Sequence, residues 1–521
     1  MREFNIAGPC NSEEHYMIDA STRLTGVEQL IDSKKYFVIH AARQSGKTTY
    51  LRDLTQRLNA GDNYYVLYCS LEGVQNIIDP EKGIPAVVRT LKAFMKYTAL
   101  PHVDQFALNV DYTDYTNVLT TSLTDYCVLL DKPLVVFFDE ADCLSEHTLI
   151  SFLRQLRNGY NNRSTTPFVR SIALVGMRNI RDYKAKVRPD SESLGSSSPF
   201  NIVTKSYTLQ NFTQDEIVTL YRQHTDATGQ IFNDNAINLV FDQTQGQPWL
   251  VNAIAREVIV EILQSDYSKP VTAELVHDAI QNIILNRPTH IDSLLERLKE
   301  ERVRKVIEPM ILGDEYFDRE SDDFLYTRDL GLIRVVNSRI EPSTPIYAEV
   351  IIRRLSSIAQ EKLQDPHYPY NIQRYLKNGR MDVDSLMCDF QQFWRVNSGM
   401  LQDCYRKYEY KESVPHLVLM AFLQRVINGG GEVRREMAAG SGRLDLYLLY
   451  QDQKYPIEVK LHRGDQYLDK GFQQTTRYLD ILGCNEGWLV VFDRREKITW
   501  EDKIFMKKEI TDGKTITIVG V

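Results

Sequence analysis

Apolar and polar positions alternate along the first 210 residues in a way that predicts a parallel sheet. Short apolar runs are separated by segments with helical spacing, such as residues 48–58, where Tyr50, Leu51, Leu54 and Leu58 share one face. Strands that alternate with helices favour a sheet with helices on both faces. The predicted strands are residues 36–40, 64–70, 134–139, 171–176 and 206–209.

From residue 213 onward the pattern becomes helical. Thr213 and Glu216 have the spacing of a capping box at a helix start, and further helical segments reach residue 285. This predicts an all-α lid on the sheet domain. Residues 289–358 combine an amphipathic helix with a short extended pair, which predicts a winged-helix-like module. Such modules bind DNA in some proteins, but packing or regulation is the favoured role here.

The C-terminal part is predicted to be a separate α/β unit. A helix at residues 415–426 ends before three glycines, which suit a helix stop. Two strands (443–450 and 455–461), a helix (471–482) and a buried strand (487–493) follow. The fold class is therefore a multidomain α/β protein with a parallel sheet, a helical lid and a second α/β fold. The predicted domains are residues 1–212, 213–288, 289–358, 359–410 (a helical connector) and 411–521.

Composition restricts the class of protein more than its function. The chain has 521 residues, 43% hydrophobic and 25% charged, which is typical of a globular protein with several cores. No apolar run reaches the length of a membrane span, and the first residues lack the pattern of a signal peptide. We therefore expect a cytoplasmic protein without a membrane partner. The net charge of −8 gives no basic footprint for nucleic acid, so charge does not decide the partner.

A phosphate-binding loop follows the first predicted strand. Residues 41–48 read AARQSGKT and match G-x-x-x-x-G-K-[ST] except at Ala41. Gly46 lets backbone N–H groups face the phosphates, Lys47 reaches the β- and γ-phosphates, and Thr48 offers its hydroxyl to Mg²⁺. The expected nucleotide-binding residues of this loop are Ala41, Arg43, Gln44, Ser45, Gly46, Lys47, Thr48 and Thr49.

Two acids complete the predicted ATP site. The apolar segment LVVFFDEAD delivers Asp139 and Glu140 to the end of a strand. Asp139 is expected to coordinate, through water, the Mg²⁺ ion to which Thr48 offers its hydroxyl, and Glu140 to polarise the attacking water as a general base. ATP binding and hydrolysis are the resulting predictions.

Two further segments resemble STAND-type and related AAA-like ATPases. Met-Arg-Asn at 177–179 follows a predicted strand, and Gly-Gln-Pro-Trp at 246–249 heads a helix. They are similar to the sensor strand and the G-x-P motif of those ATPases. The resemblance implies that Arg178 or Asn179 reads the γ-phosphate and that Pro248 faces the nucleotide. An ordinary helix start remains the alternative for Gly246 and Pro248.

A second group of chemically active residues lies near the other end of the chain. Asp445 is on one predicted strand, and Glu458 and Lys460 are two residues apart on the next, hence on one face. Two carboxylates on adjacent strands can hold a divalent metal, and a neighbouring lysine can position or deprotonate water for attack on a phosphodiester. Gln474 and Tyr478 lie one turn apart on the following helix.

This set resembles the PD-(D/E)xK nuclease superfamily. The resemblance implies that Asp445 and Glu458 bind metal (Mg²⁺ or Mn²⁺), that Lys460 is the catalytic lysine and that Gln474 orients the site. The family often has one more acid on the preceding helix, and neither Glu412 nor Glu436 matches that position. Further candidates for contacts with phosphate or substrate are Arg443 and His462, and within the loop Arg43.

The whole chain is similar to AAA-like ATPases that carry a C-terminal PD-(D/E)xK domain. The expected function is an ATPase whose nucleotide state regulates a metal-dependent DNA nuclease. One alternative is a switch-like ATPase whose inactive nuclease-fold domain only binds nucleic acid or a protein partner. Another is a motor that moves on DNA. The sequence is also compatible with a homo-oligomer, because in related ATPases an arginine from a neighbouring subunit can complete the ATP site.

Overall fold

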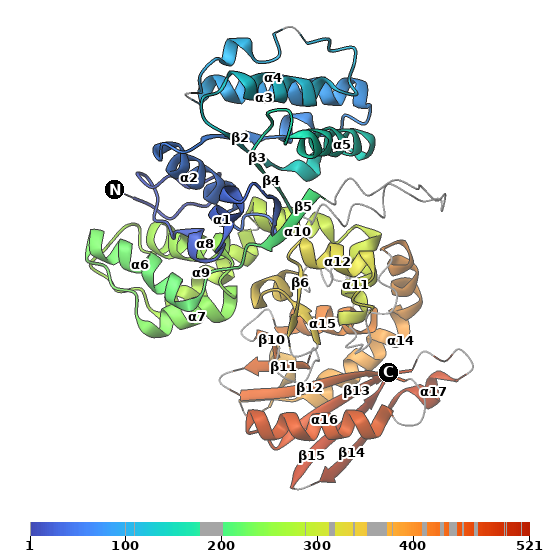
Figure 1. The fold of residues 1–521 in the computed structure, drawn as a ribbon. Helices are drawn as coiled ribbons and strands as arrows, with labels where there is room; N and C mark the ends of the chain where they lie inside the picture. Colours follow the sequence, from blue (N-terminus) through green and yellow to red (C-terminus); the bar gives the residue numbers. More distant parts are fainter. Residues whose placement is uncertain are drawn as a thin grey trace. The chain divides into compact units, whose positions relative to one another are not determined.

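The chain folds into two compact units in a computed structural model (Figure 1). The first unit comprises Met1–Asn286 and Leu325–Leu332, and the second comprises Arg287–Phe324 and Ile333–Val521. The residues that the structure describes are 2–98, 100–108, 110–177, 202–286, 288–311, 318–336, 339–351, 372–377, 379–408, 414–427, 432–436, 445–450, 453–462, 467–493, 495, 498–511 and 513–521.

A five-stranded parallel sheet forms the centre of the first unit, as the sequence pattern predicts. Its order is β2-β3-β4-β1-β5, so β4 separates the P-loop strand β1 from the acid-bearing strand β3. The last strand starts three residues earlier than predicted. The strands are β1 (Tyr36–His40), β2 (Tyr65–Ser70), β3 (Leu134–Asp139), β4 (Ser171–Gly176) and β5 (Val203–Thr208).

Helices cover both faces of this sheet because successive strand residues point to opposite sides. Phe37 and Ile39 of β1 join the core beneath α1 and α2, whereas Tyr36 and Val38 join the core beneath α3, α4 and α5. These helices are α1 (Val27–Asp32), α2 (Lys47–Ala60), α3 (Pro80–Tyr97), α4 (Val118–Leu129) and α5 (Glu146–Asn162).

A helical segment, which we call the lid, follows β5. Its first helix begins with the predicted capping box, in which Thr213 and Glu216 each bind the other's backbone N–H. Tyr221 donates a hydrogen bond of 2.9 Å to the backbone oxygen of Val251 and joins two lid helices. The lid helices are α6 (Gln214–Thr228), α7 (Asp234–Thr244), α8 (Pro248–Arg256, which continues as a π-helical turn, Glu257–Ile262) and α9 (Ala273–Asn286).

The second unit starts with three helices and a hairpin. Arg302 of α11 forms ion pairs with Asp322 and Asp323 at the start of α12, and these tie the two helices together. The end of α12 belongs to the first unit. The elements are α10 (Thr289–Arg297), α11 (Glu301–Ile311), α12 (Asp322–Asp329) and the antiparallel pair β6 (Ile333–Val336) and β7 (Arg339–Pro342).

A six-stranded mixed sheet dominates the second unit. Its order is β10-β11-β12-β13-β15-β14; β12, β13 and β15 run parallel and the other neighbours are antiparallel. The strands are β10 (Glu432–Glu436), β11 (Asp445–Tyr450), β12 (Gln453–Leu461), β13 (Glu486–Phe492), β14 (Phe505–Thr511) and β15 (Lys514–Gly520). A two-residue pair, β8 (Leu376–Lys377) and β9 (Arg380–Met381), precedes the sheet in the chain.

Helices also cover both faces of this second sheet. Leu489 and Val491 of β13 pack with Leu479 of α16 (Tyr467–Leu482). On the opposite face, the Trp488 indole donates a hydrogen bond to Asp384 of α14 (Val383–Tyr408), and Phe492 contacts rings from the same helix. The remaining helices are α15 (Val414–Ile427) and the short α17 (Trp500–Lys503). No helix in the described part of the chain is long and apolar enough to cross a lipid bilayer.

Candidate functional site

The P-loop connects the carboxyl end of β1 to the first turn of α2. Gly46 precedes α2 with φ = 91°, a left-handed conformation that glycine adopts without strain, and Gln44 has φ = 55°. Ala41 does not have a positive φ, so its backbone does not need the glycine of the usual motif. The loop therefore presents a helix N-terminus suited to an anion.

Lys47 holds the loop together from inside. Its ammonium group donates hydrogen bonds to the backbone oxygens of Ala41 (2.7 Å) and Ala42 (2.8 Å). Burial lowers the pKa of Lys47 to about 8, although the carboxylates of Asp139, Asp142 and Glu140 act in the opposite direction. The lysine therefore carries its charge at neutral pH and can exchange carbonyl oxygens for phosphate oxygens.

The two predicted acids lie beside the loop, at the end of β3. The Thr48 hydroxyl donates a 2.7 Å hydrogen bond to the Asp139 carboxylate, which also accepts one of 3.0 Å from Tyr68. Glu140 has φ = 54° and accepts a 3.1 Å hydrogen bond from Ser70. Burial raises the pKa of Glu140, which makes its carboxylate a better proton acceptor.

The oxygen atoms of Thr48 and Asp139 fit a magnesium ion, because hard oxygen donors meet at the phosphate-binding end of the loop. Within the described residues, no group of three or more His, Cys, Asp or Glu side chains could hold a metal ion. A metal here would consequently depend on substrate phosphates and water for its other ligands, which is the usual arrangement for Mg²⁺.

Sequence reasoning missed Asp142, although the motif DEAD contains it. Its carboxylate accepts a 2.8 Å hydrogen bond from the backbone N–H of Met177, just after β4. A Cβ atom on Gly176 would lie 2.5 Å from the same carboxylate, so this glycine makes room for it. Asp142 therefore fixes the start of the predicted sensor segment. Arg178 and Asn179 themselves lie outside the described residues.

The N-terminal segment joins the P-loop helix to the lid, which no motif in the sequence indicated. The backbone N–H of Cys10 donates a 3.0 Å hydrogen bond to the Thr49 hydroxyl. The Trp249 indole of the lid donates one of 2.8 Å to the backbone oxygen of Ile6. Residues 6–10 therefore lie between two of the elements predicted to contact the nucleotide.

The predicted G-x-P segment forms a tight connection at the base of the lid. α8 begins at Pro248, and the Gln247 side chain caps it by accepting a 2.6 Å hydrogen bond from the N–H of Leu250. Gly246 has φ = 71° and its backbone oxygen accepts a 2.8 Å hydrogen bond from the N–H of Phe212. A Cβ atom on Gly246 would lie 1.9 Å from the Phe212 oxygen, so only glycine fits.

Gly246→Ala is expected to destabilise the first unit more than Gly229→Ala. Gly229 also has a positive φ (79°), but a Cβ atom there meets nothing within 4 Å. Gly229→Ala, the control, should lower the free energy of unfolding by about 1–2 kcal/mol through backbone strain. Gly246→Ala should lower it by about 1–3 kcal/mol more, because its Cβ atom overpacks the site. Urea unfolding of the two variants measures the difference. Equal losses would contradict this account of Gly246.

In the second unit, Glu458 and Lys460 are buried together on the central strand β12. Their side chains are 2% and 10% exposed, and they form an ion pair with each other. Gly471 of α16 packs against Lys460, because a Cβ atom there would lie 3.2 Å from the lysine Cγ. A charged pair at this depth needs mutual compensation, since each ion alone would cost several kcal/mol, on the order of 3–5, to bury.

Asp445 is the first residue of β11, the antiparallel neighbour of β12. Leu446 of β11 pairs with Ile457 of β12, so Asp445 comes one residue before the end of this pairing and Glu458 one residue after it. On its other side, Asp445 pairs with Glu436 of β10. The antiparallel pairing of β11 with β12 confirms the hairpin predicted from the sequence.

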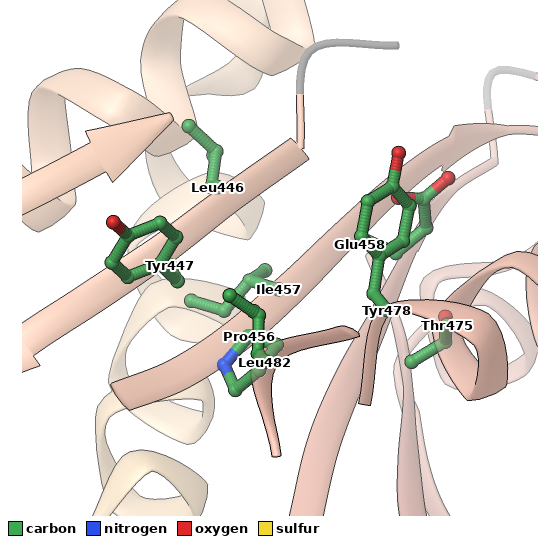
Figure 2. Close-up of a pocket in the computed structure, with 8 residues that line it drawn as sticks. All are labelled: Leu446, Tyr447, Pro456, Ile457, Glu458, Thr475, Tyr478 and Leu482. Carbon is green, nitrogen blue, oxygen red and sulfur yellow. The ribbon is translucent and has the colours of Figure 1, made fainter. Parts of the chain in front are cut away.

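A small pocket opens next to Glu458, between the β11–β12 hairpin and α16 (Figure 2). Its volume of about 10 Å³ has room for little more than one water molecule. It is therefore too small to be a nucleotide-binding site. Gln474 lies on α16, one turn before Tyr478. Lining residues are Leu446, Tyr447, Pro456, Ile457, Glu458, Thr475, Tyr478 and Leu482. Arg443 and Glu412 lie outside the described residues.

The similar solved structures each cover about two thirds of the chain. Among solved structures, the Walker-type ATPase PABY2304 of Pyrococcus abyssi is similar at 15% identity and a TM-score of 0.45, covering 67% of this chain and 99% of that one. The Aeropyrum pernix ORC1 protein in complex with DNA has 13% identity, a TM-score of 0.34 and coverage of 67% and 94%. The Thermotoga maritima RuvB Holliday junction branch migration motor has 12% identity, a TM-score of 0.32 and coverage of 64% and 92%.

These structural likenesses are distant, and comparison with curated proteins gave no match. The family model of the AAA-like domain, in contrast, matches residues 8–352, well over half of the chain. That range contains the five-stranded parallel sheet, the P-loop and the acid-bearing end of β3. The chain therefore belongs to the AAA-like domain family, with a P-loop ATPase core in its N-terminal part.

Proposed function

We propose that ATP bound at the P-loop regulates a metal-dependent DNA nuclease in the second unit. The observation that carries the nuclease half is the buried Glu458–Lys460 pair on β12, with Asp445 on the neighbouring strand β11. The ATPase half follows from the P-loop and from Thr48, Asp139 and Glu140 beside it. The domain boundaries predicted from the sequence are part of this proposal.

At the ATP site, each of the chain's own residues has a distinct role in binding or hydrolysis. Lys47 and the backbone N–H groups of the loop, from Arg43 to Thr49, bind and orient the phosphates. Mg²⁺, held by Thr48 and Asp139, would neutralise charge on the β- and γ-phosphates. Glu140 takes a proton from the attacking water, helped by its raised pKa. Arg178 reads the γ-phosphate and Pro248 faces the nucleotide from the lid.

At the proposed nuclease site, Asp445 and Glu458 are the ligands of a Mg²⁺ or Mn²⁺ ion. The fit rests on donor chemistry: a buried carboxylate on a central strand and an acid at the start of the neighbouring strand. The metal would polarise the phosphodiester and lower the pKa of water. Lys460 would position that water and, once deprotonated, accept its proton, and Gln474 would orient the site from α16.

A purely structural role explains the pair less well. Replacing a buried ion pair with apolar residues of similar volume is often neutral or stabilising. Thus stability alone gives no reason to keep Glu458 and Lys460 in a row of buried apolar residues. A metal ligand and a catalytic base give such a reason, because burial strengthens electrostatic interactions with the substrate.

Incubating the protein with linear and circular DNA tests this proposal. We expect cleavage with Mg²⁺ or Mn²⁺, none with a chelator, and none in Glu458→Gln. Lys507→Met, on the exposed edge strand β14, is the control and should cleave like the wild type. Metal binding without cleavage would favour a switch-like ATPase whose second unit only binds DNA. If the protein neither binds a divalent metal nor cleaves DNA, the nuclease assignment is wrong.

A further inference from the structure

A short segment near the middle of the chain folds with the ATPase unit rather than with its sequence neighbours. Leu325–Leu332 belongs to the first unit, whereas Arg287–Phe324 and Ile333–Val521 form the second. The chain therefore enters and leaves the ATPase unit within eight residues. We call Leu325–Leu332 the docking segment.

The docking segment is a well-formed helix end. Gly331, with φ = 77°, donates a 2.8 Å hydrogen bond to the backbone oxygen of Arg328, and Leu332 donates one of 3.3 Å to that of Thr327. These two bonds define a Schellman motif, which stops a helix at a left-handed glycine. Thr327, Asp329 and Leu332 are buried. The segment is thus a packed element.

This helix end lies directly against the P-loop. A Cβ atom on Gly331 would be 2.5 Å from the Cβ of Ala42, so the two backbones approach as closely as a glycine allows. The backbone oxygen of Ala42 is one of the two that bind the Lys47 ammonium group. The docking segment therefore contacts the part of the loop whose bonding must change when Lys47 binds phosphate.

Arg328 adds a positive charge close to the same place. His40 is the last residue of β1, immediately before the P-loop, and its ring lies 3.2 Å from the Thr208 hydroxyl. Burial, followed by the charge of Arg328 and then that of Lys47, lowers the pKa of His40 to about 4. His40 is therefore neutral at pH 7, and the charge near the end of β1 comes from Arg328 and Lys47.

We propose that the docking segment senses the occupancy of the ATP site and transmits it to the chain that follows Leu332. Phosphate binding draws Lys47 away from the Ala42 oxygen, and the Gly331 turn, packed on Ala42, must shift with it. Because Ile333 begins the second unit, this shift reaches that unit through the backbone. This inference rests on the ATP-binding half of the proposed function.

Hydrogen–deuterium exchange of the full chain, with and without Mg·ATP, tests the proposal. In the wild type, we expect ATP to change exchange at residues 325–332 and at β6 and β7. Gly331→Ala should still bind ATP, measured by calorimetry, but lose the ATP-dependent change at β6 and β7. Adding Ala42→Gly should restore that change, because it removes the methyl group that the new Cβ meets. Gly379→Ala, with φ = 75° and no neighbour within 4 Å, is the control.

The outcomes separate the two proposals. Wild-type protein that binds no ATP would overturn the proposed function, and this inference with it. Wild-type protein that binds ATP without any change of exchange at residues 325–332, β6 and β7 would overturn this inference alone. That arm needs no variant, so misfolding of Gly331→Ala cannot leave the proposal undecided. Failure of Ala42→Gly to rescue a folded Gly331→Ala would contradict the contact proposed here.

Discussion

Lys47→Ala is expected to lower ATP hydrolysis by at least about a hundredfold, the usual loss when one preorganised transition-state donor is removed. The ammonium group is buried and donates hydrogen bonds to the loop carbonyls of Ala41 and Ala42, where it can exchange these oxygens for phosphate oxygens. ATP affinity should fall as well, because the lysine binds the phosphates in the ground state. Phosphate release and calorimetric titration with ATP measure the two losses.

Arg57→Ala is the matched control for this variant. Arg57 lies on the same helix, α2, with a side chain 41% exposed and paired with Glu28 and Asp53 on the surface. Surface ion pairs of this kind contribute about 0–1 kcal/mol to the free energy of unfolding. Arg57→Ala should therefore leave the fold intact and the rate of ATP hydrolysis unchanged. Hydrolysis by Lys47→Ala at the rate of Arg57→Ala would show that the P-loop does not act as described.

Removing one partner of the buried Glu458–Lys460 pair should cost about 3–5 kcal/mol of unfolding free energy, because an uncompensated charge stays in the core. The double variant Glu458→Leu/Lys460→Met should recover most of that loss, since no charge remains buried. Both single variants and the double variant should lack nuclease activity. Denaturant unfolding and DNA cleavage, measured on the same preparations, thus separate stability from catalysis.

The pair Lys507 and Glu509 on β14 provides the comparison for this experiment. It has the same two-residue spacing on a strand, but its side chains are 68% and 38% exposed. Lys507→Met should therefore cost about 0–1 kcal/mol. A similar small loss in Lys460→Met would mean that burial does not set the energy of the Glu458–Lys460 pair.

The parts of the fold that the sequence predicted have strong local signals. A sequence motif predicts the P-loop, and the periodicity of apolar residues predicts the strands of the first sheet and the β11–β12 hairpin. The strand β14 gave no such signal, because it lies at a sheet edge and most of its residues are exposed. Residues 359–410 were predicted only as a helical connector, and the sequence did not indicate that Phe390, Phe393 and Trp394 of α14 would be buried.

Features that depend on contacts distant in sequence could not be predicted. The docking of Gly331 on Ala42 joins positions almost three hundred residues apart, and a single glycine carries no information about its partner. Likewise, the bond between Cys10 and Thr49 arises only once the N-terminal segment has folded onto α2. The nucleotide site therefore includes elements that a motif cannot identify, whereas its charged residues follow directly from the sequence.

The central claim is that nucleotide state controls metal-dependent cleavage by the second unit. It is tested most directly by the initial rate of DNA cleavage with Mg²⁺, measured with and without ATP, for wild-type protein and for Lys47→Ala. We predict a clear effect of ATP on the wild-type rate, no effect on Lys47→Ala, and no cleavage by Lys460→Met under either condition. Cleavage that is independent of ATP in the wild type, or that persists in Lys460→Met, would contradict the account.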